Sequence, residues 1–181
     1  MSKWHDLSGE QKEQILITTD ENGKPIGQAT RNDCHKGSGK THLAFVAFLF
    51  DGEGNIYIQK RSQQKSLWDG HWDVSIVSHV LPGETVQQAA QRRGMEELGV
   101  DTEFQDLGGF FYFAQYNGNC ENEYCHVLIG KSVEEVIHNP VEIEEIKKIK
   151  LEDLKKEVKN KKDKFTPWLK IALEKFALSP L

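Results

Sequence analysis

An uninterrupted apolar stretch near the start of the chain restricts the possible folds most. Residues 42–50 read HLAFVAFLF, and no side chain from Leu43 to Phe50 is polar. A strand with one solvated face alternates apolar and polar residues, so this composition predicts a strand covered on both faces. We therefore expect a central sheet strand with other elements packed on each side. The run is too short to span a bilayer, which takes about 20 apolar residues.

Turn residues and hydrophobic periodicity divide the rest of the chain into short strands and helices. DGEGN at 51–55 predicts a hairpin turn before the alternating strand IYIQKR, whereas the polar, glycine-bearing segment 31–41 predicts a loop. Further strands are expected in QILITTDENGKPIG and near residues 109–115, 123–130 and 141–151. Two helices are expected at the end, the last starting at Thr166 and Pro167. Together these elements predict a mixed, largely antiparallel sheet.

Composition indicates a globular protein and gives no reason to expect nucleic-acid binding. We interpret residues 1–181 as a single domain with a core of about 15–168. Lys and Arg number 23 against 28 Asp and Glu, so an anionic ligand would need a local cationic or metal site. The three cysteines form no CxxC pair, which argues against a disulfide framework or a structural zinc site. The start MSKWHDLSGE lacks the apolar core of a signal peptide, so we expect a cytoplasmic protein without a membrane partner. The oligomeric state is left open.

A loop and helix between residues 78 and 100 carry the strongest motif. Thr85 and Gln88 have the spacing of a capping box, and Gly99 is a natural helix stop. The span SHVLPGETVQQAAQRRGMEELGV resembles the Nudix box, which has a loop glycine, a glutamate, and then a helix reading R-E-U-x-E-E-x-G-U, where U is bulky and apolar. The positions in register are Glu84, Arg92, Glu96, Glu97, Gly99 and Val100, and the positions that depart are Ser78, Arg93 and Gly94.

The resemblance implies an α/β fold, the Nudix α/β/α sandwich, acting on a small diphosphate. In such a box the helix presents carboxylates that hold Mg²⁺ against the diphosphate, here Glu97 and Glu96. Arg93 places a cation where Nudix hydrolases have an anion. The alternative interpretation of the helix is that Arg92 with Glu96 and Arg93 with Glu97 are surface ion pairs, each worth about 0.2 to 0.5 kcal/mol.

The form RRGMEELG is similar to the box of one Nudix branch, the type I isopentenyl-diphosphate isomerases, which read RR-x-x-x-ELG. In that branch a metal is held by two histidines before the first core strand, one before the box, and two glutamates in a later strand. The matching residues are His35, His42, His79, Glu121 and Glu123. This resemblance implies a site for Mn²⁺, Mg²⁺ or Zn²⁺ with one coordination position open. It covers the chain from about Ile15 to Trp168.

The same resemblance suggests residues that contact the substrate. Tyr112 and Trp168, the latter in FTPW, match aromatic active-site residues of the branch. Lys60 and Arg61 are candidates for binding a phosphate. Taken alone, the two aromatic residues are equally compatible with a core role, and the two cations with a solvated strand edge.

One residue of this chain differs from the isomerase branch at a position on which the isomerase chemistry depends. The isomerases have a catalytic cysteine two residues before the histidine of the box entrance, and this chain has Val77. We expect isomerisation of an alkene to need a proton donor on one face and an acceptor on the other, and valine is neither. We therefore predict hydrolysis of a small organic or nucleoside diphosphate, with Glu123 or Glu97 as general base. The alternatives are an isomerase in which Cys34, Cys120 or Cys125 supplies the thiol, and a non-catalytic diphosphate-binding module.

Overall fold

The computed structural model describes residues 11–179. The first ten residues, which carry the prediction about a signal peptide, lie outside the described part. Strands in the described residues form one curled sheet: β1 (Ile15–Thr19), β2 (Pro25–Thr30), β3 (His42–Phe50), β4 (Asn55–Arg61), β5 (Trp72–Asp73), β6 (Ile76–His79), β7 (Phe104–Tyr116), β8 (Asn119–Lys131) and β9 (Ile143–Lys150). The helices are α1 (Arg31–His35), α2 (Val86–Leu98), α3 (Leu151–Asn160), η1 (Lys162–Lys164) and α4 (Pro167–Lys175). Among the residues described, no helix is long and apolar enough to cross a membrane.

Strand β3 is the centre of the sheet, as its apolar sequence predicts. It pairs antiparallel with β6 on one side and parallel with β8 on the other. The remaining strand pairs are antiparallel. The prediction of a mixed, largely antiparallel sheet is therefore confirmed.

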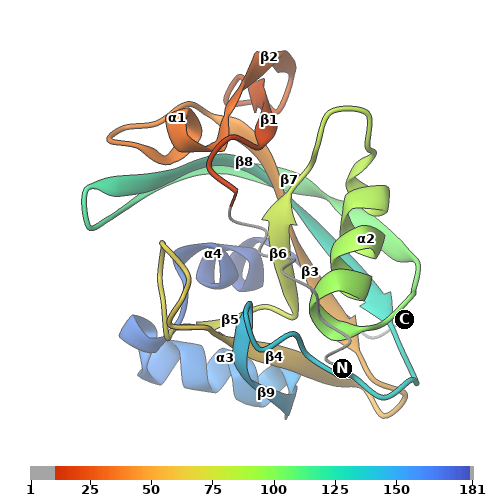
Figure 1. Ribbon diagram of the computed structural model, residues 1–181. Helices are drawn as coiled ribbons and strands as arrows, with labels where there is room; N and C mark the ends of the chain where they lie inside the picture. Colours follow the sequence, from red (N-terminus) through yellow and green to blue (C-terminus); the bar gives the residue numbers. More distant parts are fainter. Residues whose placement is uncertain (1–10, 180–181) are drawn as a thin grey trace.

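Both faces of β3 are buried, each under different helices (Figure 1). Ala44, Val46, Phe48 and Phe50 belong to a core cluster that includes side chains of α3 and α4. The alternate residues belong to a second cluster with side chains of α2. This period of two places helices on both sides of the sheet. The predicted α/β/α sandwich is thus confirmed.

The first helix corrects the prediction that residues 31–41 form only a loop. Thr30 caps α1 by accepting a hydrogen bond from the backbone N–H of Asp33 at 3.1 Å. The helix has only five residues, too few for hydrophobic periodicity to reveal it. Its last turn carries Cys34 and His35, both of which are buried. Packing of this single turn therefore decides where His35 lies.

Helix α2 begins and ends where its sequence predicts. The Thr85 and Gln88 side chains form a complete capping box, and Gly99 has a φ of 67° at the C-cap. Gly94 lies inside the helix, where a Cβ atom would be 3.3 Å from the carbonyl oxygen of Val100 and 3.5 Å from Ile76 Cδ1. Close packing of α2 on the sheet accounts for a residue that otherwise disfavours a helix.

The loop between α1 and β3 gives a test of how tightly His35 is held. Gly39 has a φ of +60°, and a Cβ atom there would be 2.0 Å from the Cys34 carbonyl oxygen. Gly37 has a φ of +67° with nothing within 4 Å of its Cβ position, so Gly37→Ala is the matched control. Both substitutions carry a left-handed strain of about 1–2 kcal/mol. We expect Gly39→Ala to lose at least about 2 kcal/mol more in urea unfolding, because backbone must also move. Equal losses would mean that the loop relaxes freely.

Candidate metal centre and active site

Side chains from four elements converge at one edge of the sheet. Strand β3 starts there, the antiparallel β6 ends there, and the parallel β8 passes through it, while α1 packs against β8. The residues brought together are His35, His42, His79, Glu121 and Glu123, and all of them are buried. The three imidazole centroids lie 4.7 to 5.1 Å apart. The structure thus gathers residues that lie as far as 88 positions apart in the sequence.

Strand register explains most of this convergence. His42 pairs with Glu123 across the parallel β3–β8 ladder, and His79 pairs with Ala44, two residues along β3. Side chains two apart on a strand point to the same face, as do Glu121 and Glu123 on β8. A one-residue slip of β8 would turn both carboxylates to the other face.

Hydrogen bonds to backbone carbonyls orient two of the imidazoles. His35 Nδ1 lies 3.0 Å from the carbonyl oxygen of Cys120, and His42 Nδ1 lies 2.8 Å from that of Lys40. A carbonyl only accepts, so each Nδ1 donates its proton and each Nε2 keeps a lone pair. Those Nε2 atoms face the cluster: His35 Nε2 lies 3.2 Å from His79 Nε2, and His42 Nε2 lies 3.4 Å from Glu123 Oε1. Metal-binding histidines have this arrangement.

Two polar atoms of the cluster are buried without a hydrogen-bond partner. They are His42 Nε2 and Glu121 Oε2. Glu121 Oε2 is 3.1 Å from His35 Nδ1, but the single proton of that nitrogen is directed to the Cys120 carbonyl. Such orphaned atoms are costly, and a cation would satisfy both.

The donor set therefore fits a divalent cation. His35, His42, His79 and Glu121 each offer a ligand atom, and these atoms lie within 4.8 Å of one another. Burial, followed by the two neighbouring imidazoles, holds the pKa of His79 well below its usual value. The ring is therefore neutral, as a metal ligand must be.

Tyr112 contacts the carboxylate that lies beside the imidazoles. The two residues pair across β7 and β8, and the Tyr112 hydroxyl donates a hydrogen bond to Glu123 Oε2. Glu123 Oε1 instead faces His42 and His79, at 3.4 Å from each Nε2. Burial and the adjacent carboxylate raise the pKa of Tyr112 well above its usual value, so the phenol keeps its proton. The pair can hold or move a proton.

A pocket opens onto these groups and combines cationic, apolar and carboxylate surfaces. Its lining comprises Arg31, Arg61, Lys65, Val77, Ser78, His79, Arg93, Tyr112, Glu121, Glu123 and Trp168. Four of the lining side chains are cationic, which suits an anionic group such as a diphosphate. Val77 and Trp168 supply apolar surface beside the carboxylates. The cavity is small, about 30 Å³, and its lining places cationic, apolar and carboxylate groups side by side.

The Nudix-box helix contributes a buried charge network next to this pocket. Arg93 is only 3% exposed, and it donates to Glu97 Oε1 at 2.9 Å and to Glu96 Oε2 at 2.7 Å. Gln59 donates to the other Glu97 oxygen at 3.2 Å. The Arg93–Glu97 pair is therefore buried and is not a surface ion pair, whereas the predicted Arg92–Glu96 pair forms at 3.4 Å and is partly exposed. Because both Glu97 oxygens have donors, the second Mg²⁺ proposed at Glu97 and Glu96 has no orphaned atom to support it here.

Some residues that the sequence suggested for the site do not line the pocket. Lys60 forms an ion pair with Glu144 at the surface, 2.7 Å away, and does not line the pocket. Among the described residues, none of the three cysteines is part of the pocket lining. Cys125 is on the same face of β8 as Glu123 but is fully buried in the core. The alternative that a cysteine reaches this site from elsewhere has no support in the geometry.

Three cations in the pocket lining have no role in the sequence prediction. Arg31 and Lys65 fall in polar segments, where nothing in the sequence distinguishes them from solvated residues. Arg93 stood out only as a departure from the Nudix box. Their common position depends on strand register and loop packing.

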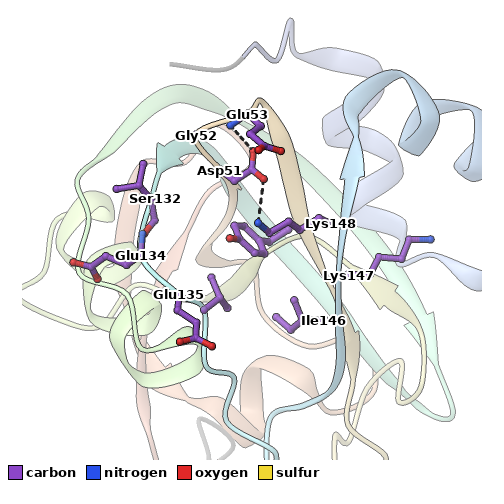
Figure 2. A pocket seen from close by; sticks show the side chains of 12 residues that line it. Asp51, Gly52, Glu53, Ser132, Glu134, Glu135, Ile146, Lys147 and Lys148 are labelled. Carbon is purple, nitrogen blue, oxygen red and sulfur yellow. Dashed lines mark hydrogen bonds and ion pairs between the residues drawn. The ribbon is translucent and has the colours of Figure 1, made fainter.

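A second hollow lies elsewhere on the protein and contains none of the predicted site residues. It is lined by side chains such as Asp51, Glu134, Glu135, Ile146 and Lys148 (Figure 2). Asp51 there accepts hydrogen bonds from the backbone of the β3–β4 turn, which lower its pKa to about 2 although burial opposes the shift. That carboxylate is a turn residue and lies outside the candidate site.

Comparison with known proteins identifies the family. Residues 40–169 match the NUDIX domain. The chain belongs to the Nudix family. The crystal structure of a Deinococcus radiodurans protein covers 89% of the chain and 98% of its own length, with a TM-score of 0.73 and 24% identity. A MutT protein from Methanosarcina mazei covers 73% and 89%, with a TM-score of 0.60 and 18% identity. These two structures support the Nudix fold alone.

Curated relatives confirm the resemblance to the isomerase branch. Isopentenyl-diphosphate Delta-isomerase 2 of Photorhabdus laumondii is 37% identical over 159 residues, covering 87% of this Nudix protein and 89% of its own length. The isopentenyl-diphosphate Delta-isomerase of Haloarcula marismortui is 33% identical and covers 94% and 95%. The Schizosaccharomyces pombe enzyme of that name is 31% identical and covers 91% and 82%.

These relatives correct the functional prediction. Val77 in place of a cysteine predicts diphosphate hydrolysis, whereas relatives across nearly the whole chain are named as isomerases. The Nudix fold and these relatives together indicate an enzyme, and the hydrolase assignment is wrong.

Metal loading gives a direct test of the His/Glu cluster. We expect the purified Nudix protein to take up one equivalent of Mn²⁺ or Zn²⁺ in elemental analysis and its melting temperature to rise with the metal, since binding to the folded state alone stabilises it. Glu121→Gln and His42→Ala should abolish the stoichiometric uptake. His126→Ala is the control, because this histidine pairs with Asp106 away from the cluster. Equal metal uptake by all four proteins would contradict the site.

Proposed function

We propose that this Nudix protein interconverts isopentenyl diphosphate and dimethylallyl diphosphate by moving a proton between two carbons. The observation that carries the proposal is the buried Tyr112–Glu123 hydrogen bond inside a pocket with apolar and cationic sides. The names of the relatives point to the same substrate. The reaction consumes no water and changes no oxidation state overall.

The atoms balance around the Tyr112–Glu123 pair. Tyr112 Oη gives its proton to the terminal alkene carbon C4, and the π electrons form the new C–H bond. Glu123 Oε2 takes a proton from C2, and the electrons of that C–H bond form the new C2–C3 double bond. The proton then passes from Oε2 to Oη along the hydrogen bond and restores the pair.

Other pocket groups bind and orient the substrate in this proposal. Arg31, Lys65 and Arg93 line the pocket, and their positive charge favours a diphosphate there; Lys65 and Arg93 also pair with Glu142, so a diphosphate would share them with that carboxylate. The Trp168 ring offers a π face to positive charge that develops at C3. A Mn²⁺, Mg²⁺ or Zn²⁺ ion held by the His/Glu cluster would supply Lewis acidity beside the carboxylates, and Mg²⁺ would accompany the diphosphate.

Val77 defines how this site differs from the cysteine-containing branch. A valine neither donates nor accepts a proton, so both transfers come from the Tyr112–Glu123 side of the substrate. The atom balance allows this, and in this respect the proposal departs from the expectation that a donor and an acceptor act on opposite faces of the alkene. A buried phenol with a raised pKa is a weak acid, so slow turnover is expected.

Isomerisation in D₂O tests the proposal. Proton NMR should show isopentenyl diphosphate converted to dimethylallyl diphosphate that carries deuterium. Tyr112→Phe should lower kcat by about 10²- to 10⁴-fold, the usual range for loss of acid–base catalysis, with metal content unchanged. Tyr116→Phe is the control, because its hydroxyl donates to Asp69 instead. Release of phosphate or diphosphate without isomerisation would refute the assignment.

A thiol at position 77 tests the effect of the valine. Val77→Cys places an S–H group in the pocket at nearly the same volume, and we expect kcat to rise by about tenfold or more, as an added acid–base group allows. Val77→Ala removes methyl groups without adding a thiol and should not raise kcat. A similar rise in both variants would assign the effect to space instead of to proton transfer.

A further inference from the structure

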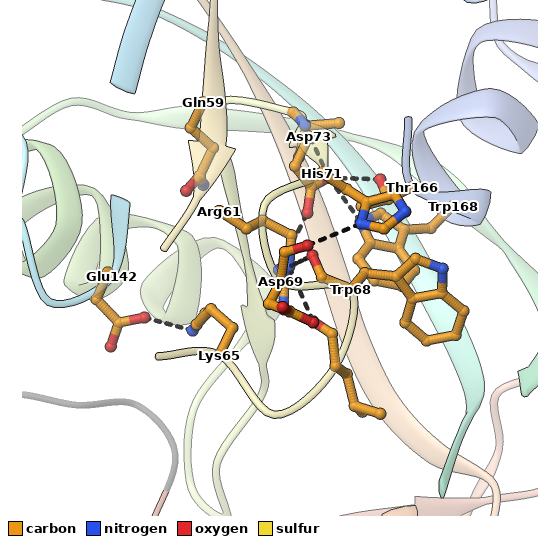
Figure 3. A network of polar contacts seen from close by, with 12 residues as sticks. Gln59, Arg61, Lys65, Trp68, Asp69, His71, Asp73, Glu142, Thr166 and Trp168 are labelled. Carbon is orange, nitrogen blue, oxygen red and sulfur yellow. Dashed lines mark hydrogen bonds and ion pairs between the residues drawn. The ribbon is translucent and has the colours of Figure 1, made fainter. Parts of the chain in front are cut away.

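Asp73 is a buried carboxylate outside the metal cluster that binds two residues of the pocket wall. Its side chain has no exposed surface. Oδ2 accepts from Arg61 Nη1 at 3.1 Å, and Oδ1 accepts from Trp168 Nε1 at 2.6 Å (Figure 3). Oδ1 also accepts from Thr166 Oγ1 at 2.9 Å. Both Arg61 and Trp168 line the pocket.

These contacts connect three separate segments of the chain. Arg61 ends β4, Asp73 ends β5, and Trp168 lies in the first turn of α4. The remaining guanidinium nitrogens of Arg61 donate to the carbonyl oxygens of Leu67 and Trp68, at 2.8 to 3.1 Å. Asp73 therefore lies at the junction of α4, the sheet and the 62–71 loop.

The Asp73 carboxylate fixes the orientation of the Trp168 ring and neutralises the charge of Arg61 in the pocket wall. The Arg61 guanidinium carbon lies 5.4 Å from the Trp168 ring centroid, so its positive charge acts on the same π system that would face the substrate. Asp73 neutralises that charge and holds the indole N–H at once. Desolvation raises the pKa of Asp73, and Arg61 opposes this shift. Burying this carboxylate costs desolvation free energy, and what it provides in return is a fixed position for its hydrogen-bond partners.

We propose that Asp73 is a positioning residue that orients the Trp168 ring toward the reacting end of the substrate and keeps the adjacent Arg61 guanidinium paired and neutralised. Its kinetic consequence rests on the proposed isomerase function. A ring displaced by about 1 Å can lower a rate by as much as about 10²-fold. An effect on kcat with little effect on KM would follow, because the diphosphate is bound by other cations.

Asp73→Asn is the main test. The amide oxygen can still accept from Trp168 and Thr166, but the amide nitrogen would face Arg61 donor to donor. We expect kcat to fall by about 10- to 100-fold with KM changed less than about threefold. Trp168→Phe keeps a ring and removes the indole N–H, so it should lower kcat in a similar way. The double variant should be within about threefold of the worse single variant, because both changes remove one coupled contact.

A readout independent of turnover separates this proposal from the proposed function. The emission of Trp168 is obtained by subtracting the spectrum of the same protein with Trp168→Phe added. Its emission maximum should shift in Asp73→Asn and stay at the wild-type wavelength in Thr166→Val. That shift is expected even if no isomerisation is ever detected. Wild-type kcat in Asp73→Asn, multiplicative losses in the double variant, or unchanged Trp168 emission would each overturn the positioning role. If Asp73→Asn does not fold, wild-type kcat in Trp168→Phe would overturn it equally.

Discussion

The convergence of three imidazoles and two carboxylates in a buried space is the constraint on which the rest of the structure depends. Groups of this kind lose their hydration when buried, and the loss is tolerable only if each lone pair and proton finds a partner. Here Nδ1 protons go to backbone carbonyls, while His42 Nε2 and Glu121 Oε2 are left for a cation. The registers of β6 and β8 on β3 determine this meeting point.

The buried carboxylates Glu97, Asp73 and Glu121 differ in how their oxygens are satisfied. Glu97 and Asp73 have donors on both oxygens, and in each case a buried arginine is one of them. Glu121 has an oxygen without any donor, and it lies among the imidazoles. A saturated carboxylate holds its neighbours in place, whereas an unsaturated one is available to bind a cation. Buried carboxylates near this pocket therefore differ in whether they have an oxygen free for a cation.

Val77 brings neither a proton donor nor a proton acceptor to a pocket whose other side chains include titratable groups. The Tyr112–Glu123 pair, the cationic wall and the imidazole cluster all remain in place around the valine. A hydrolase would need a directed water, whereas this pocket presents Val77 and Trp168 beside the proton-transferring pair. The surroundings of the substituted position are thus more informative about the reaction than the substitution itself.

The sequence alone determined the central strand, the two-sided burial, the helix of residues 86–98 and the metal-binding candidates, because each depends on local periodicity or on a motif. Tertiary structure decided what local patterns do not encode. The five-residue helix α1 is too short for a periodic signal, and its packing on β8 brings His35 to the cluster. Arg31 and Lys65 became pocket residues, and Lys60 a surface residue, only through strand register and loop closure. The role of Asp73 was equally hidden, since its partners come from segments 12 and 95 positions away and meet only when α4 packs on the sheet.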